Sequence, residues 1–552
     1  MTDTRRALLW GVFSVSLVML WDGWNKHNGQ PSMFAPPPPA ASAPGQAATP
    51  GMPAAVPAAP AGVAPLPSAT AATASEKVEI TTDRVKAVFD TRGGSLVGLT
   101  LPAYRDEHDD KKPVVLFDQS AQRVYQADSG LIPRLVGEPV LPNHTTVMTL
   151  LPGPRALADG QNELSVAFES PEQAGVKLRK TYTFKRGDYA VKVRHEVVNG
   201  SAAPVAPQLY LQLARDGSVP STSIFMGPAA FTGPAVYTES AKFQKVEFSQ
   251  IESGKASHEK SADNGWVAMV QHHFVGAWVF NDKLARSFQT KREGANLYSV
   301  AMTLPLDAIA PGATKAVETI LYAGPQEEKK LEALAPGLEL VKDYGWVTML
   351  AKPLFWLLDK LHGVIGNWGW AIVALVVLLN IAFYWLNASA YRSMGKMKAI
   401  NPKVMEIRER HKADPQKMQQ EMMRIYREEK VNPLGGCLPI FIQMPFFIAL
   451  YSVLLASVEM RGAPWVGWIT DLSVQDPYYI LPALMTATTL FQTWLNPTPP
   501  DPTQAKLMWI MPLMFSVMFI FFPAGLVLYW FVNNLLSIAQ QWMINRQLGL
   551  NR

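Results

Sequence analysis

Cysteine is almost absent from this chain: Cys437 is the only one among 552 residues. No disulfide can form within the chain, so cysteine pairing does not indicate a redox compartment. Cys437 stands in the segment GGCLP at the head of an apolar run, and no neighbouring group would stabilise a thiolate. The sequence therefore predicts a small buried side chain there and not a reactive thiol.

The sequence also lacks the motifs of common enzyme classes. It contains no glycine-rich phosphate loop, no zinc-ligand spacing and no nucleophile elbow. His272 and His273 are adjacent, so on a strand their side chains would point to opposite faces, and the charged run 106–110 is typical of a solvated loop. We therefore expect no enzyme activity, no metal and no cofactor. The net charge of +5 is small for this length, so nucleic acid could bind only at a local basic patch.

Charged side chains are missing from four long apolar stretches of the C-terminal half. A membrane-spanning helix needs about 20 mainly apolar residues, since all of its backbone polar groups must be satisfied within the helix. The last stretch is interrupted at Pro523 and Gly525, which suit a tight turn between two helices. The sequence thus predicts five spans, at about 364–386, 433–457, 478–495, 508–522 and 524–544.

A sixth predicted span lies at the N-terminus, between Ala7 and Trp21, and follows two arginines. Its length also suits a cleaved secretory signal peptide. The residues that follow it, Asp22, Gly23 and Trp24, do not form a small-x-small cleavage site. We therefore expect residues 1–28 to be an uncleaved signal anchor.

Lysine and arginine are distributed unevenly between the loops. Segment 387–432 holds eleven of them, whereas the loop 458–477 holds only Arg461. Under the positive-inside rule, segment 387–432, the loop 496–507 and both termini face the cytoplasm. The region between the first two spans then faces outward. All the loops agree with this one multi-pass topology.

The outward region divides into a linker and a folded domain. Residues 29–76 are dominated by Pro, Ala, Gly, Ser and Thr, and this composition predicts a flexible linker because it offers too few large apolar side chains for a core. From residue 77 onward, apolar and polar residues alternate with period two, as in 176–182 and 191–195. The pattern predicts antiparallel strands in an all-β sandwich over 77–340.

The sequence pattern of segment 387–432 predicts a helical hairpin. Asn401-Pro402 and Asp414-Pro415 each place a capping side chain before a proline at the first helical position. Apolar residues follow at helical spacing, among eleven cations and six carboxylates. Two interpretations stay open: a solvated helix pair with internal ion pairs, or a basic docking surface for ribosomal RNA, lipid headgroups or a nascent chain. The docking candidates are Arg392, Lys396, Lys398, Arg408, Arg410, Lys417, Arg424 and Arg427.

Several motifs of this chain are specific enough to identify a family. The segments YRSMGKMKAINPK (391–403), EKVNPLGGCLPIFIQMPFFIALY (429–451) and FPAGLVLYWFVNN (522–534) closely resemble the YidC/Oxa-type membrane protein insertases. The segment TRGGSLVGLTLPAY (91–104) resembles the periplasmic domain of the Gram-negative YidC proteins. The resemblance covers nearly everything from residue 77 onward.

The resemblance implies a polytopic α-helical protein of the bacterial inner membrane with a large periplasmic β-supersandwich. Such proteins act as insertases and chaperones that move hydrophobic segments of nascent membrane proteins into the membrane, alone or with the Sec translocon. They use no nucleotide of their own, and contact with the ribosome would fall to the cytoplasmic segments. The implied core has five spans, built from residues 362–386 and 433–552, with the hairpin between them and an interfacial helix over 341–361 before them.

The resemblance also implies a polar groove among the core spans, open to the cytoplasm and to lipid. Gln443 retains a glutamine of the family groove, and Trp530 matches a tryptophan of some members. Where the family usually has arginine or lysine, this chain has Asn380, so the groove is polar but not cationic there. Asn533 and Asn534 complete the candidates, because polar side chains in the hydrocarbon zone are costly and mark function by default. Helix–helix hydrogen bonding is the alternative interpretation of these amides.

The residues alone leave two other functional classes as alternatives. A secondary transporter would carry ionisable residues inside its spans and paired repeats, and the five core spans have neither. A membrane-anchored sugar-binding or sugar-converting protein would depend on the β domain, in which no catalytic pattern is visible. We expect an insertase whose groove holds a client's polar tail halfway across the membrane, while burial of the apolar segment in lipid drives insertion.

Overall fold

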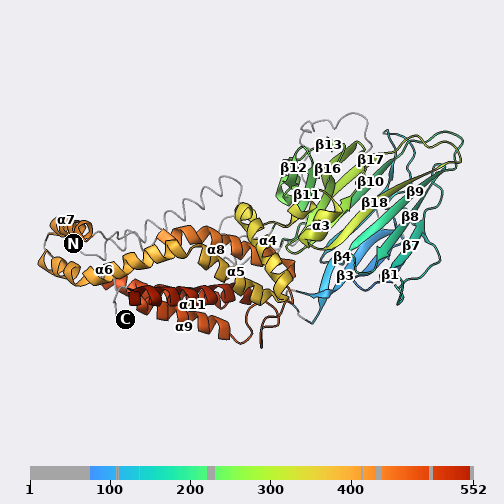
Figure 1. The fold of residues 1–552 in the computed structure, drawn as a ribbon. Coiled ribbons are helices and arrows are strands. Elements are labelled where there is room, and N and C mark those ends of the chain that lie inside the picture. The colour runs from blue at the N-terminus through green and yellow to red at the C-terminus, as the bar shows by residue number, and fades with distance from the viewer. Residues whose placement is uncertain are drawn as a thin grey trace, which may run out of the picture. The chain divides into compact units, whose positions relative to one another are not determined.

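The computed structural model describes residues 75–106, 109, 111–135, 137–219, 231–411, 414–429, 438–496 and 502–547. The predicted N-terminal span, nearly all of the predicted linker and Cys437 lie outside these residues. The described chain is a β-rich part followed by a series of helices (Figure 1).

One antiparallel sheet contains nine strands in the order β1-β2-β3-β4-β5-β10-β17-β16-β13. Strand β10 pairs with β5 on one side and with β17 on the other, and it is buried along its whole length. The strands are β1 Lys77–Thr81, β2 Lys86–Asp90, β3 Ser95–Arg105, β4 Pro113–Gln119, β5 Val124–Ile132, β10 Gln208–Asp216, β13 Ser261–Ala262, β16 Arg286–Gly294 and β17 Leu297–Pro305.

A second antiparallel sheet of nine strands has the order β12-β11-β14-β15-β18-β9-β8-β7-β6. Strands β8 and β9 keep the predicted alternation of buried and less buried residues, because successive side chains point to opposite faces. A short helix, α2 (Phe248–Glu252), follows β12. The strands are β6 Thr149–Leu150, β7 Glu163–Glu169, β8 Val176–Lys185, β9 Ala190–Asn199, β11 Gly233–Thr238, β12 Lys242–Lys245, β14 Trp266–Val270, β15 Phe274–Val279 and β18 Thr314–Pro325.

Side chains from both sheets form one hydrophobic core. Two buried aromatic residues also join the sheets through their polar ends. The Tyr125 hydroxyl on β5 donates to the Met269 carbonyl on β14 (3.1 Å), and Trp278 Nε1 on β15 donates to the Gln212 carbonyl on β10 (3.0 Å). Large aromatic residues can be buried in this way because their single polar group finds a partner.

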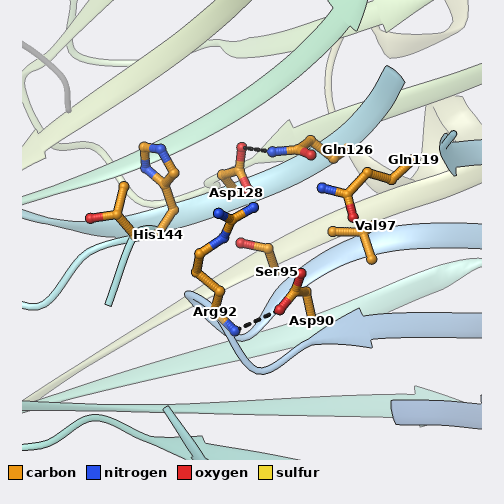
Figure 2. Close-up of a pocket in the computed structure, with 9 residues that line it drawn as sticks. Asp90, Arg92, Ser95, Val97, Gln119, Gln126, Asp128 and His144 are labelled. Atoms are coloured by element: carbon orange, nitrogen blue, oxygen red, sulfur yellow. Dashed lines mark hydrogen bonds between the residues drawn. The ribbon is translucent and has the colours of Figure 1, made fainter. Parts of the chain in front are cut away.

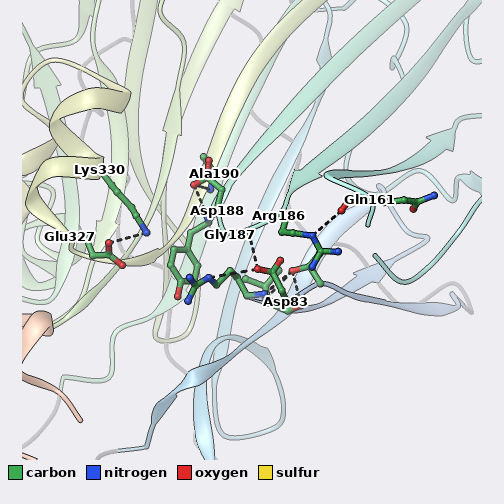
Figure 3. A network of polar contacts seen from close by, with 12 residues as sticks. Asp83, Gln161, Arg186, Gly187, Asp188, Ala190, Glu327 and Lys330 are labelled. Atoms are coloured by element: carbon green, nitrogen blue, oxygen red, sulfur yellow. Dashed lines mark hydrogen bonds and ion pairs between the residues drawn. The ribbon is translucent and has the colours of Figure 1, made fainter. Parts of the chain in front are cut away.

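Close contacts fix the loops at the strand ends. In Figure 3, the backbone N–H of Gly187, after β8, donates to the carboxylate of Asp83, before β2 (2.9 Å). In the β2–β3 turn, Gly93 has a φ of +74°, and a Cβ atom there would lie 2.5 Å from the His144 backbone. Only glycine fits this position, because it alone has no side-chain atom to clash.

The prediction for the adjacent histidines is wrong. His272 and His273 lie in the turn between β14 and β15, not within a strand, and their rings stack with centroids 3.9 Å apart. The turn therefore removes the alternation on which the prediction depended. His273 is buried, and burial holds the pKa of its imidazole well below the ordinary value, so the ring stays neutral.

A helical segment leads from the second sheet to the remaining helices. Its last helix, α4, overlaps residues 341–361, for which the family resemblance implies an interfacial helix, and it exposes Trp356, a residue type common at membrane interfaces. The segment consists of α3 Glu328–Leu334, the 3-10 turns η1 Leu338–Val341 and η2 Gly345–Val347, and α4 Thr348–Ile365.

The helices after α4 pack around a second hydrophobic core, in which α9 and α11 lie side by side (Figure 1). Among the described residues, no helix alone has the length and hydropathy of a membrane span, whereas α5 and α6 pass that test together as a pair bent by 66°. These helices are α5 Trp368–Ala382, α6 Tyr384–Arg410, α7 Pro415–Glu428, α8 Leu438–Ala456, α9 Ile480–Leu495, α10 Pro502–Phe519 and α11 Ala524–Gln547, with the 3-10 turn η3 Val458–Met460 after α8.

The prediction of one continuous helix over 364–386 is wrong, because the helix breaks at Phe383. One turn before the break, the Asn380 side chain donates to the carbonyl of Val376, four residues back (3.0 Å). Such a bond competes with the backbone ladder and bends helices. The Asn380 amide is therefore a local cause of the bend, and a hydropathy profile does not reveal it.

One of the two predicted caps in the hairpin is confirmed. Helix α7 begins at Pro415, and the Asp414 carboxylate accepts a hydrogen bond from the backbone N–H of Lys417 (3.1 Å). The proline fits the first helical position, because the N–H that it lacks would have no partner there.

The other predicted cap, at Asn401, is wrong. Helix α6 continues through Pro402 without a stop. On either side of this proline, Ile400 and Val404 are buried against apolar side chains of α7 that include Met422. This packing outweighs the local preference of Pro402 for the start of a helix.

Candidate functional site

Four helices, α6, α8, α9 and α11, surround a groove with polar and apolar walls. The groove leaves about 330 Å³ open to water molecules. On its apolar side, the rings of Phe447 and Trp530 pack edge to face with centroids 4.6 Å apart, next to Met394 and Met444. No Asp, Glu, Lys, Arg or His of the described chain lines it. Its polar side chains are the amides and hydroxyls of Asn387, Tyr391, Gln443, Thr489, Gln492, Asn496, Tyr529, Asn533, Asn534 and Ser537.

The structure brings four of the five predicted groove residues to this space. Gln443, Trp530, Asn533 and Asn534 all line it. Asn380 does not, but its side-chain Nδ2 donates to Asn533 Oδ1 (3.0 Å). Asn380 therefore supports the groove wall from behind, one hydrogen bond away from the open space.

The lining amides differ in how fully they are paired. Asn534 is buried, and its Nδ2 donates to the Thr489 hydroxyl on α9 (2.7 Å), so this amide joins two helices. Gln443 Nε2 reaches Asn387 Oδ1 on α6 only at 3.5 Å, a long and weak hydrogen bond. Asn534 thus fits the interpretation as a helix–helix contact, whereas Gln443 makes only this long side-chain bond within the described ranges.

Our sequence analysis missed part of the polar wall. On α11, Ser537 also lines the groove, and buried Gln540 and Gln541 continue the same polar face of the helix beyond it. Their helical spacing was visible in the sequence and could have been used. The groove residues of α6 carried no such signal, because they lie beyond the end of the predicted span, in the segment that we assigned to the hairpin.

The eight docking candidates lie on α6 and α7. Arg410 pairs with Glu406 (2.6 Å), and Arg424 pairs with Glu428 (3.1 Å) and Glu421. Such exposed pairs contribute little to stability. The hairpin therefore presents a surface of mixed charge, in which part of the cations are already matched by carboxylates.

A second cavity lies beside the β2–β3 turn (Figure 2), lined by Asp90, Arg92, Ser95 and Asp128 among others. It has about 30 Å³ open to water, enough for roughly one or two water molecules. Asp128 Oδ2 accepts from Gln126 Nε2 (2.9 Å), whereas Asp128 Oδ1 and Ser95 Oγ have no hydrogen-bond partner among the described residues. This cavity fits buried water and is too small for a substrate.

Next to this cavity, Lys180 on β8 is completely buried. Its Nζ donates to the carbonyls of Gly93 and Ser129, each at 2.6 Å, and so ties the β2–β3 turn to β5. Burial lowers the pKa of Lys180 to about 7, and burial together with Lys180 lowers the pKa of His195 to about 3. These groups have little room around them, so we interpret them as structural. In the described ranges, no set of three or more His, Cys, Asp or Glu side chains is placed to hold a metal ion.

Comparison with known proteins gives matches over almost the whole chain. The family model of the YidC periplasmic domain matches residues 77–357, and that of the 60Kd inner membrane protein matches residues 360–550. The membrane protein insertase YidC of Cupriavidus necator is 57% identical over 555 residues, which cover 99% of this chain and 98% of that protein. The membrane protein insertase YidC of Ralstonia nicotianae is 54% identical over 557 residues, which cover 100% of this chain and 99% of that protein. A solved structure of an active YidC insertase is 19% identical, with a TM-score of 0.41, and covers 85% of this chain and 92% of its own.

Proposed function

Since this chain belongs to the YidC family of inner-membrane protein insertases and carries that family's periplasmic domain, we propose that the groove between α6, α8, α9 and α11 is its insertion path. The substrates of this protein are membrane proteins. The observation that carries the proposal is an open space lined by uncharged polar side chains within a bundle of apolar helices.

The groove lowers the barrier to insertion, and the client supplies the driving force. A polar tail that crosses hydrocarbon without partners loses its hydrogen bonds with water, which is costly. Amides and hydroxyls such as those of Gln443 and Ser537 replace part of that hydration halfway across. The client's apolar segment meanwhile gains about 25 cal/mol for each Å² that it moves from water into lipid. No nucleotide is needed in this scheme.

The finer topology is part of the same proposal. We propose six spans, with both termini and the α6–α7 hairpin in the cytoplasm, because lysine and arginine concentrate in segment 387–432. The bent pair of α5 and α6 supports a first core span that continues into the hairpin. The two nine-stranded sheets support a β-supersandwich in the periplasm. The Sec translocon and the ribosome are proposed partners, and the ribosome would contact Arg392, Lys396 and their neighbours on the hairpin.

The β domain is proposed to have no catalytic role. The cavity beside the β2–β3 turn holds only about 30 Å³ of space for water. The buried cations and imidazoles next to it are engaged with backbone and hydroxyl groups, as Lys180 is with two carbonyls. A catalytic group must reach its substrate, and these side chains are enclosed.

Site-specific crosslinking tests the insertion path. A photoreactive amino acid replaces Gln443 or Trp530, which line the groove, or Phe515, which is exposed on α10 and does not line it. The full-length protein is then combined with ribosomes that carry a stalled nascent membrane protein. We expect strong crosslinks to the client from positions 443 and 530 and weak ones from 515.

Equal yields from all three positions would contradict the proposed path, because a client that diffuses over the outer surface would meet Phe515 as often as the groove. A soluble nascent chain of the same length serves as the negative control, and it should give no crosslink from any of the three positions.

A further inference from the structure

The loop between η3 and α9, residues 461–479, is tied to two other helices of the bundle. The Asn367 side chain, which caps the start of α5, donates through Nδ2 to the carbonyl of Pro464 (3.1 Å). The backbone N–H of Gly525, at the start of α11, donates to the carbonyl of Leu472 (2.9 Å). The fold therefore fixes which side chains of this loop are exposed.

The 461–479 loop carries little free charge. After Arg461 it contains no Lys, Arg or His, and its acidic residues are Asp471 and Asp476. The Asp471 carboxylate accepts hydrogen bonds from the backbone N–H and the hydroxyl of Ser473 (2.8 and 2.7 Å), and Asp476 is buried. The loop thus lacks the exposed Lys, Arg, Asp and Glu side chains that are typical of a surface in contact with water.

Buried Asp476 orders the end of the loop. Its Oδ1 accepts from Trp468 Nε1 and from the backbone N–H of Tyr478, each at 3.0 Å, and its Oδ2 accepts from the backbone N–H of Leu481 in α9 (2.7 Å). The next residue after Tyr478, Tyr479, has a left-handed φ of +56°, which residues other than glycine rarely adopt. One carboxylate thus holds two aromatic residues in place beside a strained backbone.

Several large apolar side chains of this loop are exposed. Tyr478 is 67% exposed, and even Trp468, whose ring nitrogen is bound to Asp476, is 36% exposed. Exposed apolar side chains that lie together mark contact with lipid or with another protein. The exposed members are Val466, Trp468, Val474, Tyr478 and Tyr479.

The apolar surface continues on α9, which begins directly after Tyr479. Exposed residues at spacings of 4, 7 and 3 lie on one side of this helix: Ile480, Leu484, Phe491 and Trp494. In a membrane span, such a side faces the acyl chains. The loop then lies where the hydrocarbon ends, and Trp and Tyr concentrate at that boundary because they have an apolar ring and a polar tip.

We propose that the 461–479 loop anchors the outward end of the helical bundle in the lipid headgroup region. Asp476 is a positioning residue, which sets Trp468 and Tyr478 for this contact. Lipid is the partner that the surface fits, because the loop has almost no free charge and adjoins the apolar side of α9. The inference requires that α9 spans the membrane, and it does not require the groove to be the insertion path.

The test measures how deeply the loop enters the membrane. In the full-length protein with Cys437→Ser, a spin label is attached at Val474→Cys, and the protein is placed in liposomes of phosphatidylethanolamine and phosphatidylglycerol. Electron paramagnetic resonance then compares collisions of the label with oxygen, which concentrates in hydrocarbon, and with a nickel chelate, which stays in water. The matched control is Val140→Cys, because Val140 is also an exposed valine but belongs to the β domain.

We expect the oxygen-to-nickel ratio at position 474 to exceed the ratio at position 140 several-fold. Equal ratios would overturn the inference, and so would a label at 474 that neither reagent reaches, because protein would then cover the loop. A label at Leu484→Cys, in the middle of α9, separates the two possible failures. A high ratio at 484 with a low one at 474 overturns the anchor alone, whereas a low ratio at 484 overturns the proposed span and the anchor with it.

Variants of Asp476 test its role with the same label at position 474. Asp476→Ala releases Trp468 and Tyr478 and should lower the ratio several-fold, while the label at 484 keeps its high ratio. Asp476→Asn keeps an oxygen that can accept from both partners and should restore most of the ratio. An unchanged ratio in Asp476→Ala would show that this carboxylate does not position the anchor.

Trp468→Ser should also lower the ratio at position 474, because it removes an anchoring ring. Its matched control is Trp494→Ser, since Trp494 is likewise exposed but lies near the other end of α9. This control should leave the ratio at 474 unchanged. Equal effects of the two variants would contradict a specific role of the loop.

Discussion

The β domain and the helical groove both bury polar side chains, but they bury them in opposite ways. In the β domain, a lysine and an imidazole sit in a tight core, where Lys180 donates to two carbonyls at 2.6 Å and His195 contacts the Ser129 hydroxyl at 2.9 Å. In the groove, neutral amides face about 330 Å³ of open space, and the bond from Gln443 to Asn387 is long, at 3.5 Å. The contrast teaches that burial alone does not mark a functional polar group. A functional polar group is marked by unused hydrogen-bonding capacity next to space for a ligand.

The largest expected effect comes from breaking the tight cluster. Lys180→Ala leaves the buried carbonyls of Gly93 and Ser129 without their donor, which should cost about 1–3 kcal/mol of β-domain stability for each carbonyl. Urea unfolding of the full-length protein in detergent, followed by near-ultraviolet circular dichroism, measures this loss. An unchanged unfolding midpoint would mean that the cluster is not the structural element that we describe.

A fall in pH should have a smaller effect: it should lower the stability of the β domain and leave the groove unchanged. Burial holds the pKa of His195 near 3, below its ordinary 6.5, so below pH 6.5 the unfolded chain binds a proton that the folded domain does not. Above pH 6.5, His195 does not lower the free energy of unfolding of the β domain. As the pH falls from 6.5 toward 3, that free energy decreases by at most about 1.4 kcal/mol per pH unit. Melting of the β domain should therefore shift down by several degrees between pH 7.5 and pH 5, where most carboxylates remain ionised.

The groove provides the internal control for this pH experiment, because its described lining has no carboxylate, imidazole or amine to titrate. The relative insertion of an apolar-tailed client should therefore change little over the same pH range. A β domain whose melting temperature does not respond to acid would contradict the buried, neutral state of His195.

The smallest expected effect is the loss of one groove hydrogen bond. Asn534→Ala removes the bond to Thr489 between α11 and α9, and such bonds between membrane helices are worth about 0.6 kcal/mol on average. Thermal unfolding followed by the far-ultraviolet helix signal measures the change, with Thr489→Val as the matched partner. A loss as large as that of Lys180→Ala would erase the distinction between the two regions.

Much of this molecule could be predicted from local patterns. The period-two stretches of the β domain became strands, and the Asp414-Pro415 cap became the start of α7. Local patterns fail where distant contacts decide the structure. Strand β10 pairs with β5 and β17, which lie far from it in sequence, and α6 passes through Pro402 because of its packing on α7.

The groove also could be predicted only in part from local sequence patterns. Gln443 and Trp530 were found through the family motifs, and Asn533 and Asn534 through the cost of polar groups in hydrocarbon. Asn387 was missed, because only the bent path of α5 and α6 brings it opposite Gln443. The sequence also could not show that Asn380 Oδ1 lacks a hydrogen-bond partner among the described residues, since this depends on which neighbours accept the two amide hydrogens.

The unbroken course of α6 has a mechanical consequence. A helix from Tyr384 to Arg410 is about 40 Å long, and it carries the groove residues Asn387 and Tyr391 near one end and the contact with α7 near the other. The break at Phe383 separates this rod from α5. One continuous helix therefore sets both the position of the hairpin contact and the position of one groove wall.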